Sequence, residues 1–170
     1  ISNRGMMDWL RNLFGAGDPA LGVAKAVGAR MGTKPASVGA AWRLTGTWDG
    51  RRCQIVLGGG GDGMRVTMRG AGSDGKWEIR WAREAADGEV FVSGQVVLSE
   101  PDASRLEALP LSTRLHVIEV VEAGRGSIVR SAGAFTLQVD NAGLGRPDAA
   151  AQAEIRLDVL CELASAWSEG

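Results

Sequence analysis

The feature that most constrains this chain is an alternation of apolar and polar residues that runs, with turns between its segments, from Ala41 to Leu98. Alternation with a period of two is typical of strands that bury one face and expose the other. Asp49-Gly50 divides the first two alternating runs, and Asp-Gly in this position is the strongest local signal of a β-hairpin. Further Gly-rich turns follow, so the sequence predicts five successive strands in an antiparallel meander. These strands are expected over residues 41–48, 52–57, 64–69, 76–81 and 89–98.

Helical patterns precede the alternating region. Residues 6–14 place Met, Trp, Leu and Phe at helical spacing, which predicts a short amphipathic helix. A second helix is expected over 18–31, because Asp18 is a favourable N-cap and Gly32 is a favourable stop. Residues 33–39 contain a proline and are predicted to be a linker.

The C-terminal half adds helices and two more strands. A capping-box pattern that begins at Ser99 predicts a short helix. Residues 111–123 fit either a helix or a strand, because the middle of this segment is rich in β-branched residues. Strands are expected over 127–130 and 134–140, and an apolar stripe predicts a last helix over 147–167.

These elements predict one α+β domain over residues 6–170, a mainly antiparallel sheet of about seven strands covered on one face by the N- and C-terminal helices. A pleckstrin-homology-like barrel with a helical insertion is the alternative, since seven strands ahead of a C-terminal helix also resemble that fold. The length of 170 residues and the hydrophobic content of 45% fit a single soluble domain. Residues 1–5 are interpreted as a vector remnant ahead of Met6.

Composition and charge exclude several classes of function. The net charge of -1 argues against a dedicated binder of nucleic acid or of an anionic membrane. His116 is the single histidine, and Cys53 and Cys161 are the two cysteines, so the chain has neither a disulfide framework nor a clustered zinc-ligand set. No apolar run fits a signal peptide, so we expect a cytoplasmic protein. The start at Met6 resembles that of a bacterial protein, and the few histidines and cysteines lead us to expect no metal or cofactor.

Two motifs that resemble catalytic or nucleotide sites are better explained as structural features. The glycine run from Gly58 to Gly63 is followed by a strand pattern instead of the helix that a dinucleotide loop requires, so a hairpin loop is expected. Ser112, His116 and Glu119 share one side of the predicted helix, but a convex helix side provides no oxyanion donors. We expect no enzymatic activity.

The two faces of the predicted sheet carry different residues, and each is a candidate site. The apolar face forms either a filled core or a pocket for an apolar ligand. Its candidate ligand-binding residues are Trp42, Trp48, Met64, Met68, Trp77 and Trp81. The polar face is expected either to be solvated or to bind a partner. Its candidate partner-binding residues are Arg43, Arg52, Arg65, Arg69 and Arg80, beside Lys76. No aromatic residue falls on this predicted face to stack on bases, so an acidic protein is favoured over nucleic acid, and a homodimer stays open.

The segment Gly46–Arg51, which reads Gly-x-Trp-x-Gly-Arg, opens the sheet, and a later helix is followed by Phe135–Val139. This order is similar to uncharacterised bacterial domains of unknown function, and the resemblance implies the fold alone. We therefore expect a non-catalytic bacterial protein-interaction module. The alternative is a protein that binds a small apolar ligand or a lipid.

Overall fold

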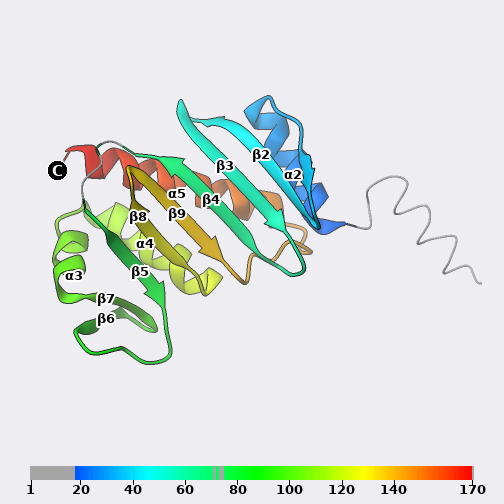
Figure 1. Cartoon of the computed structure of the whole chain (residues 1–170). Coiled ribbons are helices and arrows are strands. Elements are labelled where there is room, and N and C mark those ends of the chain that lie inside the picture. Colours follow the sequence, from blue (N-terminus) through cyan, green and yellow to red (C-terminus); the bar gives the residue numbers. More distant parts are fainter. Residues whose placement is uncertain (1–17, 71, 73–74, 170) are drawn as a thin grey trace, which may run out of the picture.

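The computed structural model describes residues 18–169 except 71, 73 and 74 (Figure 1). The predicted helix over 6–14 and the proposed vector remnant therefore lie outside the described residues. Four helices are described: α2 (Pro19–Met31), α3 (Glu100–Glu107), α4 (Leu111–Gly124) and α5 (Ala149–Glu169). The nine strands are β1 (Ala36–Val38), β2 (Ala41–Trp48), β3 (Arg51–Gly58), β4 (Met64–Arg69), β5 (Trp77–Trp81), β6 (Glu89–Ser93), β7 (Val96–Ser99), β8 (Ser127–Ser131) and β9 (Ala134–Val139).

All nine strands form one antiparallel sheet in the order β1-β2-β3-β4-β9-β8-β5-β7-β6. The predicted α+β class and the antiparallel sheet are confirmed. The sheet is open, with β1 and β6 as its two edges, so the barrel alternative is wrong. β1 has three residues, all exposed, and β6 carries a register break between Phe91 and Ser93.

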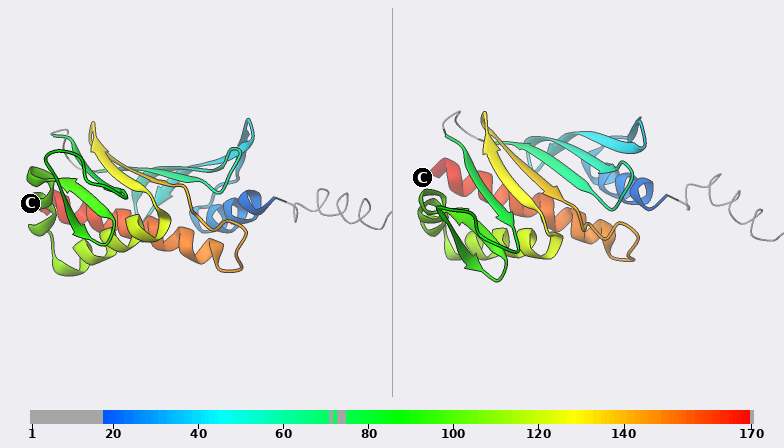
Figure 2. Two further views of the ribbon diagram at one scale, coloured as in Figure 1. Left: turned by 90° about the horizontal axis from the view of Figure 1, so that it is seen from below. Right: turned by 60° about the horizontal axis from the view of Figure 1, so that its bottom comes forward.

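The helices lie on one face of the sheet and leave the other face uncovered (Figure 2). Helix α2 packs on β2 and β3, helix α4 packs on β5 and β7, and helix α5 contacts both of these helices. The buried apolar residues between the two layers form one continuous core cluster. The prediction that helices cover one face of the sheet is therefore confirmed, with α2 and α5 as two of the covering elements.

Local signals in the sequence explain several boundaries. The Asp18 side chain accepts hydrogen bonds from the first-turn amides of α2, which then ends at Gly32 in the left-handed conformation, with φ of 69°. Asp49 and Gly50 both have positive φ, 49° and 80°, as the tight turn between β2 and β3 requires. Ser99 caps α3 through the amide of Asp102, so these sequence predictions are confirmed.

Three sequence expectations differ from the structure. The five-strand meander is wrong, because the β8–β9 hairpin inserts between β4 and β5. Alternation fixes which face a side chain takes, but it does not fix which strand lies alongside. The count of seven strands rises to nine because the predicted linker contains β1 and because the run over 89–98 divides into β6 and β7 around Gly94, which has φ of 44°.

The segment that fitted either a helix or a strand is helix α4. Its β-branched residues Val117, Val120 and Val121 are buried in the core cluster. Tertiary packing therefore outweighs their intrinsic preference for strands. Helix α4 ends at Gly124, and its C-cap residue Arg125 takes the left-handed conformation with φ of 47°.

Candidate functional site

The uncovered face of the sheet is built from alternate residues of six neighbouring strands. Figure 1 looks onto this face, with the helices behind it. Pairing across the strands brings distant residues into one row: Arg65 lies opposite Gln138, Gln138 opposite Ser127, and Ser127 opposite Arg80. We call this surface the open face; it comprises the outward residues of β2, β3, β4, β9, β8 and β5. It collects side chains from two halves of the chain.

Four of the five predicted partner-binding arginines are exposed on the open face, namely Arg43, Arg52, Arg65 and Arg69. The Arg65 Nε donates a hydrogen bond to the Gln138 Oε1 at 3.0 Å, which orients its guanidinium along the sheet. The guanidinium groups of these four arginines are planar and permanently charged, so they can bind carboxylate groups of a partner. The exposed Lys76 lies just before β5.

Arg80 differs from the other four because it is half-buried and forms an ion pair with Glu89 of β6. Hydrogen bonds from the Arg80 side chain and the Ala86 amide hold the pKa of Glu89 below its usual value. Arg80 therefore joins two strands and offers less free charge to a partner than the other arginines.

Uncharged polar residues fill the middle of the open face. A shallow depression of about 520 Å³ is lined there by hydroxyl and amide side chains next to Arg52 and Arg69. These uncharged residues are Thr45, Thr47, Gln54 and Thr67. Thr136, Gln138, Ser127 and Val129 extend the same surface over β9 and β8. These last four residues are not among the site residues predicted from the sequence, although the alternation in Phe135–Val139 indicates that Thr136 and Gln138 share a face.

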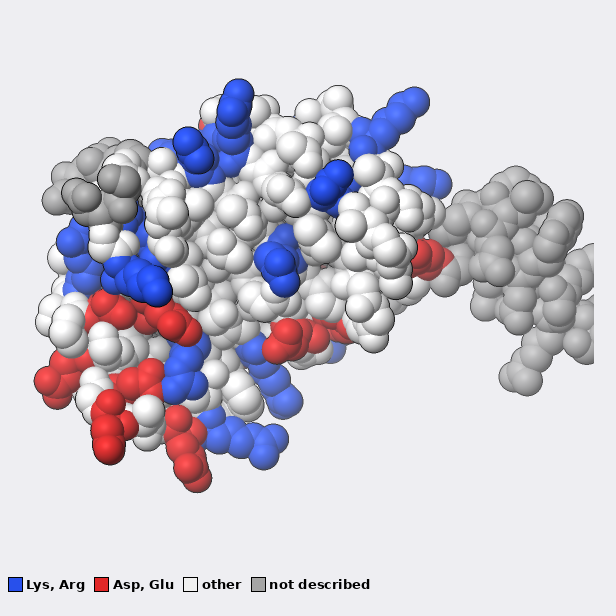
Figure 3. All heavy atoms as spheres, viewed as in Figure 1, with Lys and Arg blue, Asp and Glu red and all other residues white. Residues whose placement is uncertain are grey.

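Charge is distributed unevenly over the view of the open face in Figure 3. Basic side chains are spread over the wide part of the sheet, and acidic side chains gather around β6, β7 and α3. Acidic residues in and beside these elements include Glu84, Asp87, Glu89, Glu100 and Asp102. A partner that covers the open face and reaches past β5 to β7 and β6 thus meets opposite charges at its two ends.

The covered face holds the predicted ligand-binding residues in two different environments. Trp48, Met64, Met68 and Trp77 are buried in the core, whereas Trp42 and Trp81 are half-buried. The indole N–H of Trp48 donates to the Asp158 Oδ1 at 2.8 Å, and that of Trp77 donates to the Asp102 carbonyl at 3.0 Å. Trp77 also meets Trp167 edge to face, with ring centroids 5.2 Å apart.

The two cysteines belong to the same covered layer. Burial raises the pKa of the Cys53 thiol to about 11. Burial is also the main reason that the pKa of the Cys161 thiol is raised to about 11. The Cys161 Sγ lies 3.3 Å from the Met68 Sδ and 3.5 Å from the Trp48 carbonyl oxygen. Thiols that stay protonated in an apolar setting are poor nucleophiles and poor metal ligands.

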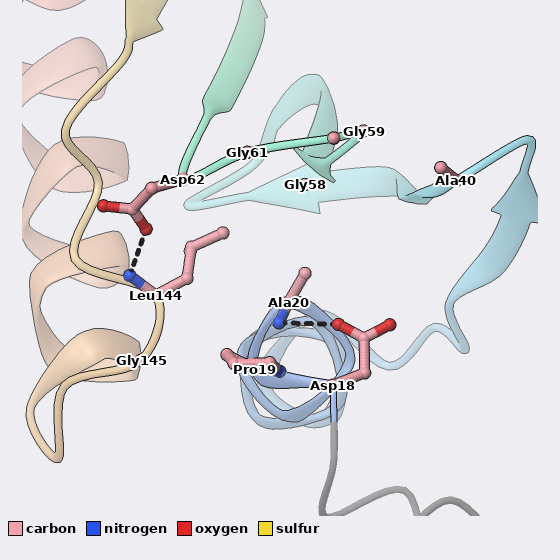
Figure 4. A pocket seen from close by; sticks show the side chains of 11 residues that line it. Asp18, Pro19, Ala20, Ala40, Gly58, Gly59, Gly61, Asp62, Leu144 and Gly145 are labelled. Atoms are coloured by element: carbon pink, nitrogen blue, oxygen red, sulfur yellow. Dashed lines mark hydrogen bonds between the residues drawn. The ribbon is translucent and has the colours of Figure 1, made fainter.

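The glycine run forms the connection between β3 and β4, as expected, and one wall of a pocket of about 290 Å³ (Figure 4). Gly58, Gly59 and Gly60 have φ of 81°, 95° and 102°, which other residues rarely adopt. The Asp62 carboxylate accepts hydrogen bonds from the amides of Gly143 and Leu144, both at 2.7 Å. The loop thus fastens the chain ahead of α5 to the sheet.

His116 connects two helices. Its Nδ1 lies 2.9 Å from the Glu162 Oε2 on α5, and the Thr113 hydroxyl donates to the Glu162 Oε1 at 2.9 Å. Glu119 and His116 border a hollow of about 180 Å³ between α4 and α5. Ser112 is exposed, and the histidine's described partner is a carboxylate on α5.

A further concave surface runs along the outer side of α2. This groove of about 610 Å³ is mainly apolar. We call it the α2 groove; it is lined by Leu21, Lys25 and Ala29 of α2 and by Thr33, Lys34, Pro35 and Trp42. The indole N–H of Trp42 donates to the Asp18 Oδ2 at 2.8 Å, so the start of α2 is tied to the groove wall.

Two kinds of feature are absent from the described part of the chain. No three His, Cys, Asp or Glu residues gather there in a way that would hold a metal ion. None of its helices combines the length and the apolar character that crossing a bilayer requires.

The fold and the open face define an antiparallel sheet backed by helices on one side. No protein-family model matches this chain, and no curated protein matches it by sequence. Among solved structures, it is similar to the crystal structure of the mycobacterial trehalose monomycolate transport factor A, TtfA, with a TM-score of 0.53 and 12% identity. The match covers 86% of this chain and 91% of that chain. At this identity the likeness shows a common fold, which agrees with the fold-level resemblance inferred from the sequence.

Proposed function

We propose that this chain is a non-catalytic binding module that recognises a protein partner through the open face. One observation carries the proposal: the helices cover only one face of a wide sheet, and the other presents exposed arginines among threonine and glutamine side chains. A broad and shallow surface of this kind suits a macromolecule more than a small molecule, which is usually enclosed.

The chemistry of the open face favours an acidic partner. Arg52 and Arg69 flank the depression, and guanidinium groups bind carboxylates through paired hydrogen bonds. Within the described strands β2, β3, β4, β8 and β9, no outward residue is aromatic, so the face offers no stacking platform for bases. A cytoplasmic location is part of the same proposal, because both cysteines are free, buried thiols.

The test is affinity capture from a lysate of the bacterial source. Arg65→Glu with Arg69→Glu is expected to abolish capture of the partner that the unmodified chain retains, because two attractive charges become repulsive. Arg83→Glu with Arg146→Glu is the matched control, since both residues are exposed and lie in connections outside these strands. This control is expected to retain the partner.

Three results decide the proposal. The captured protein should carry an acidic surface and should be released by salt, because screening weakens exposed charge pairs. Capture that survives the Arg65 and Arg69 reversal would refute the role of the open face. Light scattering that shows twice the chain mass, reduced to one chain by the same reversal, would identify the partner as a second copy.

The second candidate function is binding of a small apolar ligand or lipid, and the similarity to TtfA favours it. That protein is named as a trehalose monomycolate transport factor. The candidate residues on this chain remain the Trp and Met side chains of the covered face, of which Trp42 and Trp81 are half-buried. Native mass spectrometry of protein purified from its source should then show a bound apolar molecule. A clean chain mass that stays unchanged after incubation with fatty acid would exclude this candidate.

A further inference from the structure

The α2 groove is an apolar surface that the described chain leaves open. Leu21, Lys25 and Ala29 are spaced four residues apart, so they form one side of α2 along most of its length. Trp42 and Pro35 form the opposite wall. Lys25 is exposed and Trp42 is half-buried, which leaves the groove accessible to another apolar element.

The sequence supplies an element of matching length directly ahead of this groove. Residues 6–14 carry Met6, Trp9, Leu10, Leu13 and Phe14 at helical spacing. As a helix, these nine residues would extend about 13 Å at about 1.5 Å per residue, and the nine residues of α2 from Leu21 to Ala29 extend equally far along the groove.

The link between the two elements limits where this segment can lie. Residues 15–17, Gly-Ala-Gly, join it to Asp18. Two antiparallel helices are commonly joined by about two to five residues. The Asp18 carboxylate also binds the indole of Trp42, so the described chain begins at the groove wall.

Charge fits the same arrangement. Antiparallel helices with this short link place Asp8 about level with Lys25, which lines the groove. Lys25 and Lys34 are the charged residues that line the groove, and both are basic. Asp8 is the acidic residue of the segment and Arg11 is its basic residue. Asp8 lies four residues before Asn12, on the polar side of the segment, where the long side chain of the exposed Lys25 can reach it from the edge of the groove.

We propose that residues 6–14 pack as a helix in the α2 groove of their own chain, antiparallel to α2, with Trp9 and Leu13 against Leu21 and Trp42. The inference does not depend on the function proposed for the open face. This helical hairpin completes the helix layer beside β1 and β2. It also makes Trp42 a core contact.

Paramagnetic relaxation in the full-length chain tests the proposal. Asn12→Cys places a spin label on the polar side of the segment, and the two native cysteines are buried, so labelling is selective. The amide signals of Leu21, Lys25 and Ala29 and the indole signal of Trp42 should lose most of their intensity. Signals of β6 and β7, which are remote from α2 in the fold (Figure 1), should keep theirs.

Matched variants separate docking from mere proximity. Trp9→Ser with Leu13→Ser, carrying the same label, should restore the groove signals while the signals of the sheet stay unchanged. Asp8→Lys should weaken the broadening, and Asp8→Lys combined with Lys25→Glu should recover it.

Four outcomes would overturn the proposal. The first is no broadening at the groove in the labelled chain. The second uses a mixture of two chains, one isotope-enriched without a spin label and the other spin-labelled without isotopes. Broadening of the groove signals in this mixture assigns the groove to a second copy. The third is broadening that appears only after an apolar molecule is extracted, which assigns the groove to that ligand. The fourth is a segment that contacts only added vesicles of anionic lipid.

Discussion

The two faces of this sheet are made from the same strands, yet they have different physical roles. Trp77 and Glu78 are consecutive on β5, and one is 2% exposed while the other faces solvent. The same contrast holds for Met68 and Arg69 on β4. One face is committed to packing against the helices, and the other is free to carry polar groups at little cost in stability. Alternation therefore lets one short sequence encode a core and a candidate binding surface together.

The asymmetry comes from where the helices lie. Helix α5 has 21 residues and is therefore about 30 Å long, enough to run behind much of the sheet (Figure 1). It contacts β4 and β9 and both helices α2 and α4. Because the described helices lie behind the sheet, none of them covers the open face.

The largest expected effect comes from removing an indole on the covered face. Trp77→Ala should lower the free energy of unfolding by about 3–5 kcal/mol, because it leaves a cavity beside Trp167 and removes the hydrogen bond to the Asp102 carbonyl. Glu78→Ala, one residue along, should change it by less than about 0.5 kcal/mol. Chemical denaturation of both variants measures the difference. Equal losses would mean that the two faces are not distinguished as described.

Thiol reactivity offers a second comparison of the faces. At pH 8.5 an ordinary thiol is about half ionised, whereas Cys53 and Cys161, with pKa values of about 11, are almost entirely protonated. Both should therefore react with an aromatic disulfide reagent at least about a hundredfold more slowly than Thr67→Cys on the open face. Rapid reaction of all three thiols in folded protein would contradict this expectation.

The same thiols set the direction of an alkaline effect. Their folded pKa values exceed the unfolded value of about 8.5, so their contribution to stability is complete below that pH. It is lost progressively as the pH rises through about 11, because only the unfolded state releases the protons. Cys53→Ala with Cys161→Ala should flatten this alkaline decline in denaturation curves.

The smallest expected effect concerns the single ion pair that joins β5 to β6. Arg80 lowers the pKa of Glu89, so this pair stabilises the fold above the usual carboxyl pKa, and its contribution is lost as the pH falls. Glu89→Gln should cost about 1 kcal/mol or less at neutral pH, since the pair is partly solvated. Glu84→Gln, an exposed acid in the preceding connection, should cost less. A larger loss for Glu84→Gln would show that the pair does not stabilise β6.

The alternation predicted the faces of side chains correctly because that property is local. It placed Trp48, Met68 and Trp77 on one face and Arg65 and Arg69 on the other before any neighbour was known. The insertion of β8 and β9 was not predictable in this way, because strand partners depend on loop paths and on the packing of α4 and α5.

The candidate site shows the same limit. Thr136 and Gln138 belong to the open face only because β9 pairs with β4, far away in the sequence. The pairing of Arg80 with Glu89 likewise depends on how β5, β7 and β6 come together. Residue types in one strand therefore revealed part of the surface, and tertiary pairing supplied the rest.

The two edges of the sheet determine how the open face can be used. An exposed strand edge is a template for further strands, and chains that join there grow into sheets without limit. Here β1 offers only Ala36–Val38, and the irregularity between Phe91 and Ser93 interrupts β6. Both edges therefore disfavour the addition of strands from other chains. The molecule can present a wide polar sheet face to a partner without polymerising through strand pairing at its edges.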